Sequence, residues 1–140
     1  MKMPWRWPGM PAVLLAAAGA GCGSSGPGLE RVPPGLWGGE HVSVQVTVSD
    51  ATLQFDCAHG YVPERIRVDG DGRFSVAGVF VREHGGPISP GEREDSHPAR
   101  YEGSTDGRML SFEVQLTDQP STVGPFQASL GGPARLFRCY

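Results

Sequence analysis

The chain has 140 residues, of which 39% are hydrophobic, and it carries a formal net charge of −3 at pH 7. This length accommodates one domain with a core of its own rather than two. Acidic residues outnumber basic ones and no basic stripe is present, which argues against binding to nucleic acid and against electrostatic docking on anionic lipid.

The start of the chain has the pattern of a secretory signal peptide. Lys2 and Arg6 supply positive charge, and residues 10–20 are apolar but too few to span a bilayer. The sequence AGAGC then resembles the lipobox of bacterial lipoproteins, although Gly19 stands where that family usually has a branched apolar residue. The resemblance implies that Cys22 becomes the lipidated first residue of a membrane-anchored protein of the cell envelope, periplasmic or at the cell surface. An ordinary cleaved signal is the alternative.

If Cys22 carries lipid, the two remaining cysteines form an even pair in an oxidising compartment. This predicts a disulfide between Cys57 and Cys139. The segment GSSGPGLERVPP that follows Cys22 is typical of a flexible tether, with ends about 20 Å apart. The chain therefore divides into a signal peptide (1–21), a lipidated cysteine with its tether (22–34) and a folded domain (35–140).

Alternation of apolar and polar residues with a period of two predicts that this domain is made of short strands. In the sequence HVSVQVTV, for example, four valines share one face. Eight strands are expected, at residues 41–48, 52–57, 64–68, 72–81, 99–104, 109–116, 123–130 and 134–140. Pro125 marks its strand as an edge or a bulge position.

The connections between these strands alternate between tight turns and longer loops. Four are short and rich in Gly, Asp and Ser, as in hairpins, while residues 58–63, 83–98 and 117–122 form longer connections. Sequential antiparallel strands form a meander, and closing it into a barrel removes the exposed edges. We therefore predict an all-β domain, a small up-and-down barrel, with a β-sandwich as the alternative fold.

The sequence GLW, with Gly35 and Trp37, precedes the first expected strand and resembles the G-x-W signature of the lipocalin and calycin group. The resemblance implies that an arginine of the last strand, Arg135 or Arg138, lies across the tryptophan. It implies no binding residues. The inward faces of the expected strands are almost entirely Val, Leu, Ile and Phe, which suits a filled core better than the ligand cavity of a lipocalin.

Strand direction alternates in a meander, so four histidines from separate parts of the chain are expected at one end of the barrel. His59, Glu83, His84 and His97 are the candidate ligand or metal site, because neutral imidazoles with a carboxylate suit zinc. Their spacing matches no fixed metal motif. The tether is expected to join this end, which would then face the membrane.

No catalytic residue is assigned, because the sequence contains neither a nucleophile elbow nor a glycine-rich phosphate loop. No cofactor is expected. The long connection at residues 83–98 favours a surface for a protein partner or a small ligand, since such loops in compact domains are often functional. We therefore predict a lipid-anchored binding or structural module; the alternative is a zinc-binding protein or metal-dependent enzyme that uses the loop histidines.

Overall fold

The computed structural model describes residue 9 and residues 28–139. The expected signal peptide, apart from Gly9, lies outside the described residues, as do Cys22 and residues 23–27 of the expected tether. Within the described part of the chain, no helix is long and apolar enough to cross a membrane.

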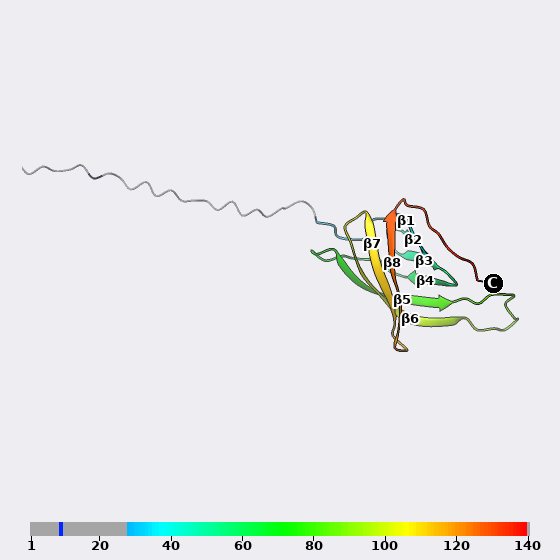
Figure 1. The fold of residues 1–140 in the computed structure, drawn as a ribbon. Coiled ribbons are helices and arrows are strands. Elements are labelled where there is room, and N and C mark those ends of the chain that lie inside the picture. Colours follow the sequence, from blue (N-terminus) through cyan, green and yellow to red (C-terminus); the bar gives the residue numbers. More distant parts are fainter. Residues whose placement is uncertain (1–8, 10–27, 140) are drawn as a thin grey trace, which may run out of the picture.

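Eight antiparallel strands follow one another around a closed barrel (Figure 1). They are β1 (Gly35–Gly39), β2 (Val42–Val46), β3 (Ala51–Phe55), β4 (Ala58–Val62), β5 (Arg73–Arg82), β6 (Asp95–Thr105), β7 (Met109–Leu116) and β8 (Ser121–Leu130). The predicted all-β meander barrel is confirmed, and the closed sheet excludes the sandwich.

Two of the strands were not predicted. β1 comprises the residues GLWGG, where glycines replace the side chains that would show a period of two. A Cβ atom at Gly39 would lie 1.8 Å from the carbonyl oxygen of Gln127, so β1 needs glycine in order to approach β8. In β4, the inward positions are Ala58, Gly60 and Val62, too small to give an apolar signal. The expected loop at residues 58–63 is therefore wrong.

Two predicted strands are absent from the barrel. Residues 64–68 belong to the β4–β5 connection, where Arg67 forms an isolated bridge with Arg31. Residues 134–139 form an extended C-terminal segment that makes one bridge, between Arg135 and Glu40. In residues 64–68, Ile66 is buried and Val68 packs against the core, so this stretch alternates without belonging to the sheet. In the C-terminal segment, Leu136 and Phe137 are 41% and 57% exposed, so the alternation there does not correspond to a buried face.

The barrel interior is filled with side chains. Trp37, Tyr101 and five valines are the largest fully buried side chains. Phe55, Phe112 and Phe126 stack with ring centroids 4.8–6.3 Å apart. The gap left between the inward side chains measures about 10 Å³, room for at most one water molecule. Among residues 28–139, the barrel interior therefore holds no lipocalin-like ligand cavity.

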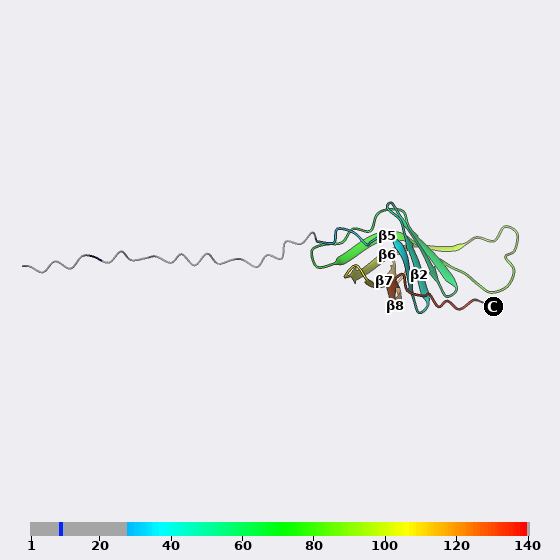
Figure 2. The same cartoon turned by 90° about the horizontal axis from the view of Figure 1, so that it is seen from above.

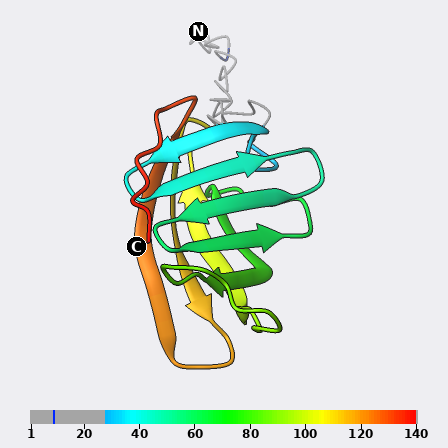
Figure 3. The same cartoon turned by 90° about the vertical axis from the view of Figure 1, so that its right-hand side faces the viewer.

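The barrel closes where β1 meets β8 over two residue pairs, Trp37 with Leu130 and Gly38 with Ser129. Seen from one end, β1–β4 cross the long strands β7 and β8 (Figure 3). Pro125 lies where the register between β7 and β8 shifts, which confirms the predicted edge or bulge position.

The N-terminal segment joins the barrel at the opposite end from the one expected. Val32 N–H donates to the Ile66 carbonyl (2.9 Å) and Val68 N–H to the Glu30 carbonyl (3.1 Å), so this segment packs on the β4–β5 connection. The β5–β6 loop and the C-terminus lie at the other end (Figures 1 and 2). The prediction that the tether joins the histidine end is therefore wrong. It failed because the missed strand β1 carries the chain once along the barrel before His41.

A histidine-rich end with a loop-covered cavity

All four histidines lie at one end of the barrel, which we call the histidine end. It comprises the β1–β2 and β3–β4 turns, the β5–β6 loop (residues 83–94) and the β7–β8 turn (residues 117–120). His41 lies in the first turn, His59 near the start of β4, His84 in the loop and His97 near the start of β6. The meander brings together side chains that are up to 56 residues apart in the chain.

A cavity of about 290 Å³ lies beneath the β5–β6 loop, close to the size of small-molecule sites. Three of the four candidate site residues line it, namely His59, Glu83 and His84. Val81, which is 6% exposed, contributes an apolar wall. The remaining charged groups in its lining are Arg82, Glu92, Arg93, Glu94 and Asp95. Carboxylates therefore outnumber guanidinium groups around the cavity.

His84 is held at both ring nitrogens. Nδ1 donates to the Gly85 carbonyl (2.9 Å), and Nε2 is hydrogen-bonded to Oε1 of Glu92. The bond to Gly85, and then the bond to Glu92, raise the pKa of His84 above its ordinary value. The other carboxylate oxygen of Glu92 accepts from Ser89 N–H (2.9 Å), and this bond together with His84 lowers the pKa of Glu92. The His84–Glu92 pair therefore joins the two sides of the β5–β6 loop.

His97 lies outside the cavity, between two carboxylates. Its Nδ1 is 2.7 Å from Oδ2 of Asp118 in the β7–β8 turn, and its Nε2 is 2.8 Å from Oδ1 of Asp95. The side chain is 14% exposed. The bond to Asp118 is the main cause of a raised pKa of His97; partial loss of water opposes it and Asp95 adds to it. Asp118 was missed in the sequence, although its turn was expected at this end.

The other two histidines each have one such partner. His59 Nδ1 lies 2.7 Å from Oε1 of Glu83, which joins β4 to the residue after β5. His41 Nδ1 is hydrogen-bonded to Asp56, which joins the β1–β2 and β3–β4 turns. Every histidine therefore faces a carboxylate, but in four separate pairings. Among residues 28–139, no three His, Cys, Asp or Glu side chains are grouped so as to hold a metal ion.

Cys57 and Cys139 lie beside one another at the histidine end, as a disulfide requires, with Cα atoms 5.2 Å apart. The C-terminal segment reaches Cys57 along β1: Arg135 N–H donates to the Gly39 carbonyl (3.0 Å), and Phe137 N–H donates to Asp56 (2.7 Å). This contact ties the last residues to the β3–β4 turn.

Trp37 is fully buried, and its indole N–H donates to the Pro33 carbonyl (3.1 Å). The guanidinium of Arg135 is instead exposed and donates to Glu40 (2.9 Å). Arg138 is also exposed. Gly35 begins β1 with φ of 144°, a conformation that favours glycine.

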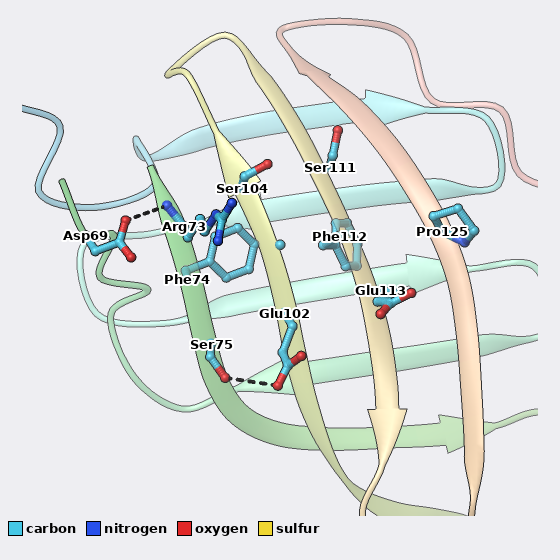
Figure 4. Close-up of a pocket in the computed structure, with 11 residues that line it drawn as sticks. Asp69, Arg73, Phe74, Ser75, Glu102, Ser104, Ser111, Phe112, Glu113 and Pro125 are labelled. Carbon is cyan, nitrogen blue, oxygen red and sulfur yellow. Dashed lines mark hydrogen bonds between the residues drawn. The ribbon is translucent and has the colours of Figure 1, made fainter. Parts of the chain in front are cut away.

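A second concavity, an open groove of about 650 Å³, lies on the outer face of β5–β8 (Figure 4). Its floor is formed by small side chains, including Ser75, Ser104 and Ser111. Glu102 stands opposite Glu113 in the β6–β7 pairing, and it is hydrogen-bonded to Gln115 Nε2 (3.2 Å). Fewer titratable side chains line this groove than line the cavity at the histidine end, so the histidine end is the stronger candidate for a functional site.

No known protein family, curated protein or solved structure matches the chain.

Proposed function

We propose that this is a lipid-anchored protein of the cell envelope that binds a cationic ligand at the histidine end, without catalysing a reaction. The observation that carries the proposal is that the N-terminal segment and the cavity lie at opposite ends of the barrel. Residues 28–34 join one end, whereas the cavity beneath the β5–β6 loop opens at the other. An anchor at Cys22 would therefore leave the cavity facing away from the membrane.

The lining of the cavity favours a cation. Glu83, Glu92, Glu94 and Asp95 bring four carboxylates to a space that holds two arginines. Val81 and Ile88 add apolar surface, which suits the aliphatic stem of a lysine or arginine side chain. The ligand class that fits is a basic segment of a partner protein, bound through its amino or guanidinium groups.

Calorimetric titration of the mature protein with tetralysine at low salt tests this function. We expect measurable binding by the native protein and its loss when residues 84–93 are replaced by Asn-Gly, which joins Glu83 to Glu94 through a tight turn. Glu94→Gln removes one carboxylate from the lining, and we expect it to weaken binding about fivefold.

Two controls accompany this titration. The shortened loop removes mainly exposed residues, so thermal unfolding is expected to stay cooperative with a similar midpoint. Glu113→Gln removes a carboxylate from the outer groove and is expected to leave tetralysine binding unchanged. Equal binding by the native and the shortened protein would show that the cavity is not the site.

A further inference from the structure

We propose that His84 and His97 form a pH-sensitive latch, closed while both imidazoles are protonated, that holds the β5–β6 loop over the cavity and the β7–β8 turn against β6. The proposal rests on the cavity being the binding site, and it supplies the regulation of that site. Loss of the protons releases the loop and frees Glu92 for a cationic ligand.

The geometry of the two histidines requires both ring nitrogens to carry hydrogen. An ionised carboxylate and a carbonyl oxygen can only accept hydrogen bonds, and a neutral imidazole has a single N–H. His84 faces Gly85 and Glu92 with its two nitrogens, and His97 faces Asp118 and Asp95. Only an imidazolium satisfies both contacts at once.

The remaining histidines provide an internal comparison. His41 and His59 each meet a carboxylate through Nδ1 alone. A neutral imidazole with its hydrogen on Nδ1 keeps that bond. Each of these contacts therefore needs a single ring hydrogen, whereas the two contacts made by His84, and the two made by His97, need two.

The loop is built so that its closure depends on this pairing. His84 and Glu92 face one another across the loop, and both line the cavity. Gly86 and Gly91 lie just inside this pair with φ values of 85° and 81°, a backbone conformation that favours glycine at both positions. Ile88 is 79% exposed, so the tip of the loop is not buried against the barrel.

His97 holds the neighbouring turn. Thr117 donates through its N–H (2.9 Å) and its hydroxyl (3.2 Å) to the Pro98 carbonyl, and His97 adds the bond to Asp118 one residue further on. Its second bond goes to Asp95, where the β5–β6 loop ends. One imidazolium thus joins the turn to the base of the loop.

Other charged groups also surround the latch. The cavity beside His84 is also lined by His59, Arg82, Glu83, Arg93, Glu94 and Asp95. Three carboxylates and two guanidinium groups in this set largely offset one another, so the pKa of His84 is raised by its own contacts, first with Gly85 and then with Glu92. His97 lies between Asp95 and Asp118, which act in the same direction.

The sign of the pH dependence follows from these contacts. Because the pKa values of His84 and His97 are raised in the folded protein, the latch contributes fully below the ordinary histidine pKa and is lost as pH rises through the raised values. Protonated His84 competes with a cationic ligand for Glu92. Affinity for tetralysine is therefore expected to increase with pH over the same interval.

Nuclear magnetic resonance of the mature protein between pH 5 and pH 9 tests the latch. We expect the ring nitrogens of His84 and His97 to titrate with midpoints above about 6.5. The nitroxide TEMPOL probes access to Val81 behind the loop. As pH rises, TEMPOL is expected to relax the Val81 methyl groups more strongly, and the midpoint of this increase should equal the midpoint at which His84 titrates.

Partner variants separate a latch from an ordinary titration. In Glu92→Gln, the midpoint of His84 should fall, and TEMPOL should reach Val81 throughout the pH range. In Asp118→Asn, the midpoint of His97 should fall and the amides of the β7–β8 turn should lose their pH dependence. Glu113→Gln, on the outer groove, is the matched control and should change neither midpoint.

Two results would overturn the latch: neutral rings of His84 and His97 at pH 6, or access of TEMPOL to Val81 that is the same in the native protein and in Glu92→Gln. The titration with tetralysine is read separately. If His84 and His97 titrate as described but the protein does not bind tetralysine, the proposed ligand is refuted. The proposed latch is then still supported.

Discussion

At the scale of single residues, Gly60 illustrates how closely the barrel is packed around Tyr101. A Cβ atom at Gly60 would lie 2.1 Å from the hydroxyl oxygen of Tyr101, which donates to the Val79 carbonyl (2.7 Å). Tyr101 is 1% exposed, so its ring has no room to move. We expect Gly60→Ala to lower the free energy of unfolding by about 1–3 kcal/mol, measured by urea denaturation.

A matched glycine and a double variant test this explanation. Gly70 has open space where a Cβ would lie, so Gly70→Ala is expected to change stability by less than about 0.5 kcal/mol. Tyr101→Phe removes the hydroxyl that meets the new methyl group, and the cost of Gly60→Ala should be smaller in that background. An equal cost in both backgrounds would contradict a clash with the hydroxyl.

Residue types alone could place the histidines at one end but could not pair them. His41, His59, His84 and His97 were expected together because strand direction alternates, and the barrel brings them to one end. The partner of His97 could not be predicted in this way. Asp118 is 21 residues away, and its contact depends on how the β7–β8 turn bends toward β6. Nothing in a period of two specifies that bend.

At the scale of elements, the barrel could be predicted where inward side chains are large. The valines of β2 and the Leu and Phe residues of β7 gave clear alternation. β1 and β4 were missed because their sequences provide glycine and alanine at places of close approach. The same close approach makes those residues necessary to the fold, so the signal was weakest where the packing is tightest.

The cysteine pair at disulfide distance connects two elements that the sheet does not join. Cys57 ends the β3–β4 turn and Cys139 lies in the C-terminal segment, 82 residues later. Closing a loop of this length restricts the unfolded chain, so we expect the double variant Cys57→Ala, Cys139→Ala to lose about 4 kcal/mol of stability. Urea denaturation of the native and variant proteins measures the difference.

Alkylation followed by mass spectrometry checks the bond itself. The native protein is expected to react at neither Cys57 nor Cys139 until it is reduced. A reductant should lower the stability of the native protein and leave that of the double variant unchanged. Two thiols that react in the unreduced protein would show that the pair is not bridged.

At the scale of the whole molecule, the position of β1 decides which end of the barrel would face a membrane if the chain is anchored at Cys22. β1 begins beside the β4–β5 connection, and ten-residue β5 runs from that end toward the histidine end. At about 3.3 Å per residue, the two ends of β5 lie roughly 30 Å apart along the strand. Cys22 precedes Gly28 by six residues, which span at most about 20 Å. An anchor at Cys22 would therefore keep the end of the barrel that residues 28–34 join near the bilayer, and the cavity at the histidine end away from it.

Anchoring at Cys22 and the orientation of the barrel can be tested in one reconstituted system. We expect Cys22→Ala to release the folded protein from membranes into the soluble fraction, because acyl chains on Cys22 would supply the attachment.

The orientation of the barrel is tested with a fluorophore attached to Ile88→Cys in the loop or to Gly70→Cys at the other end, in vesicles with nitroxide-labelled headgroups. Quenching should be stronger at position 70 than at position 88. Stronger quenching at position 88 would place the cavity against the bilayer, and Cys22→Ala protein that stays bound after a salt wash would show that another part of the chain is the anchor.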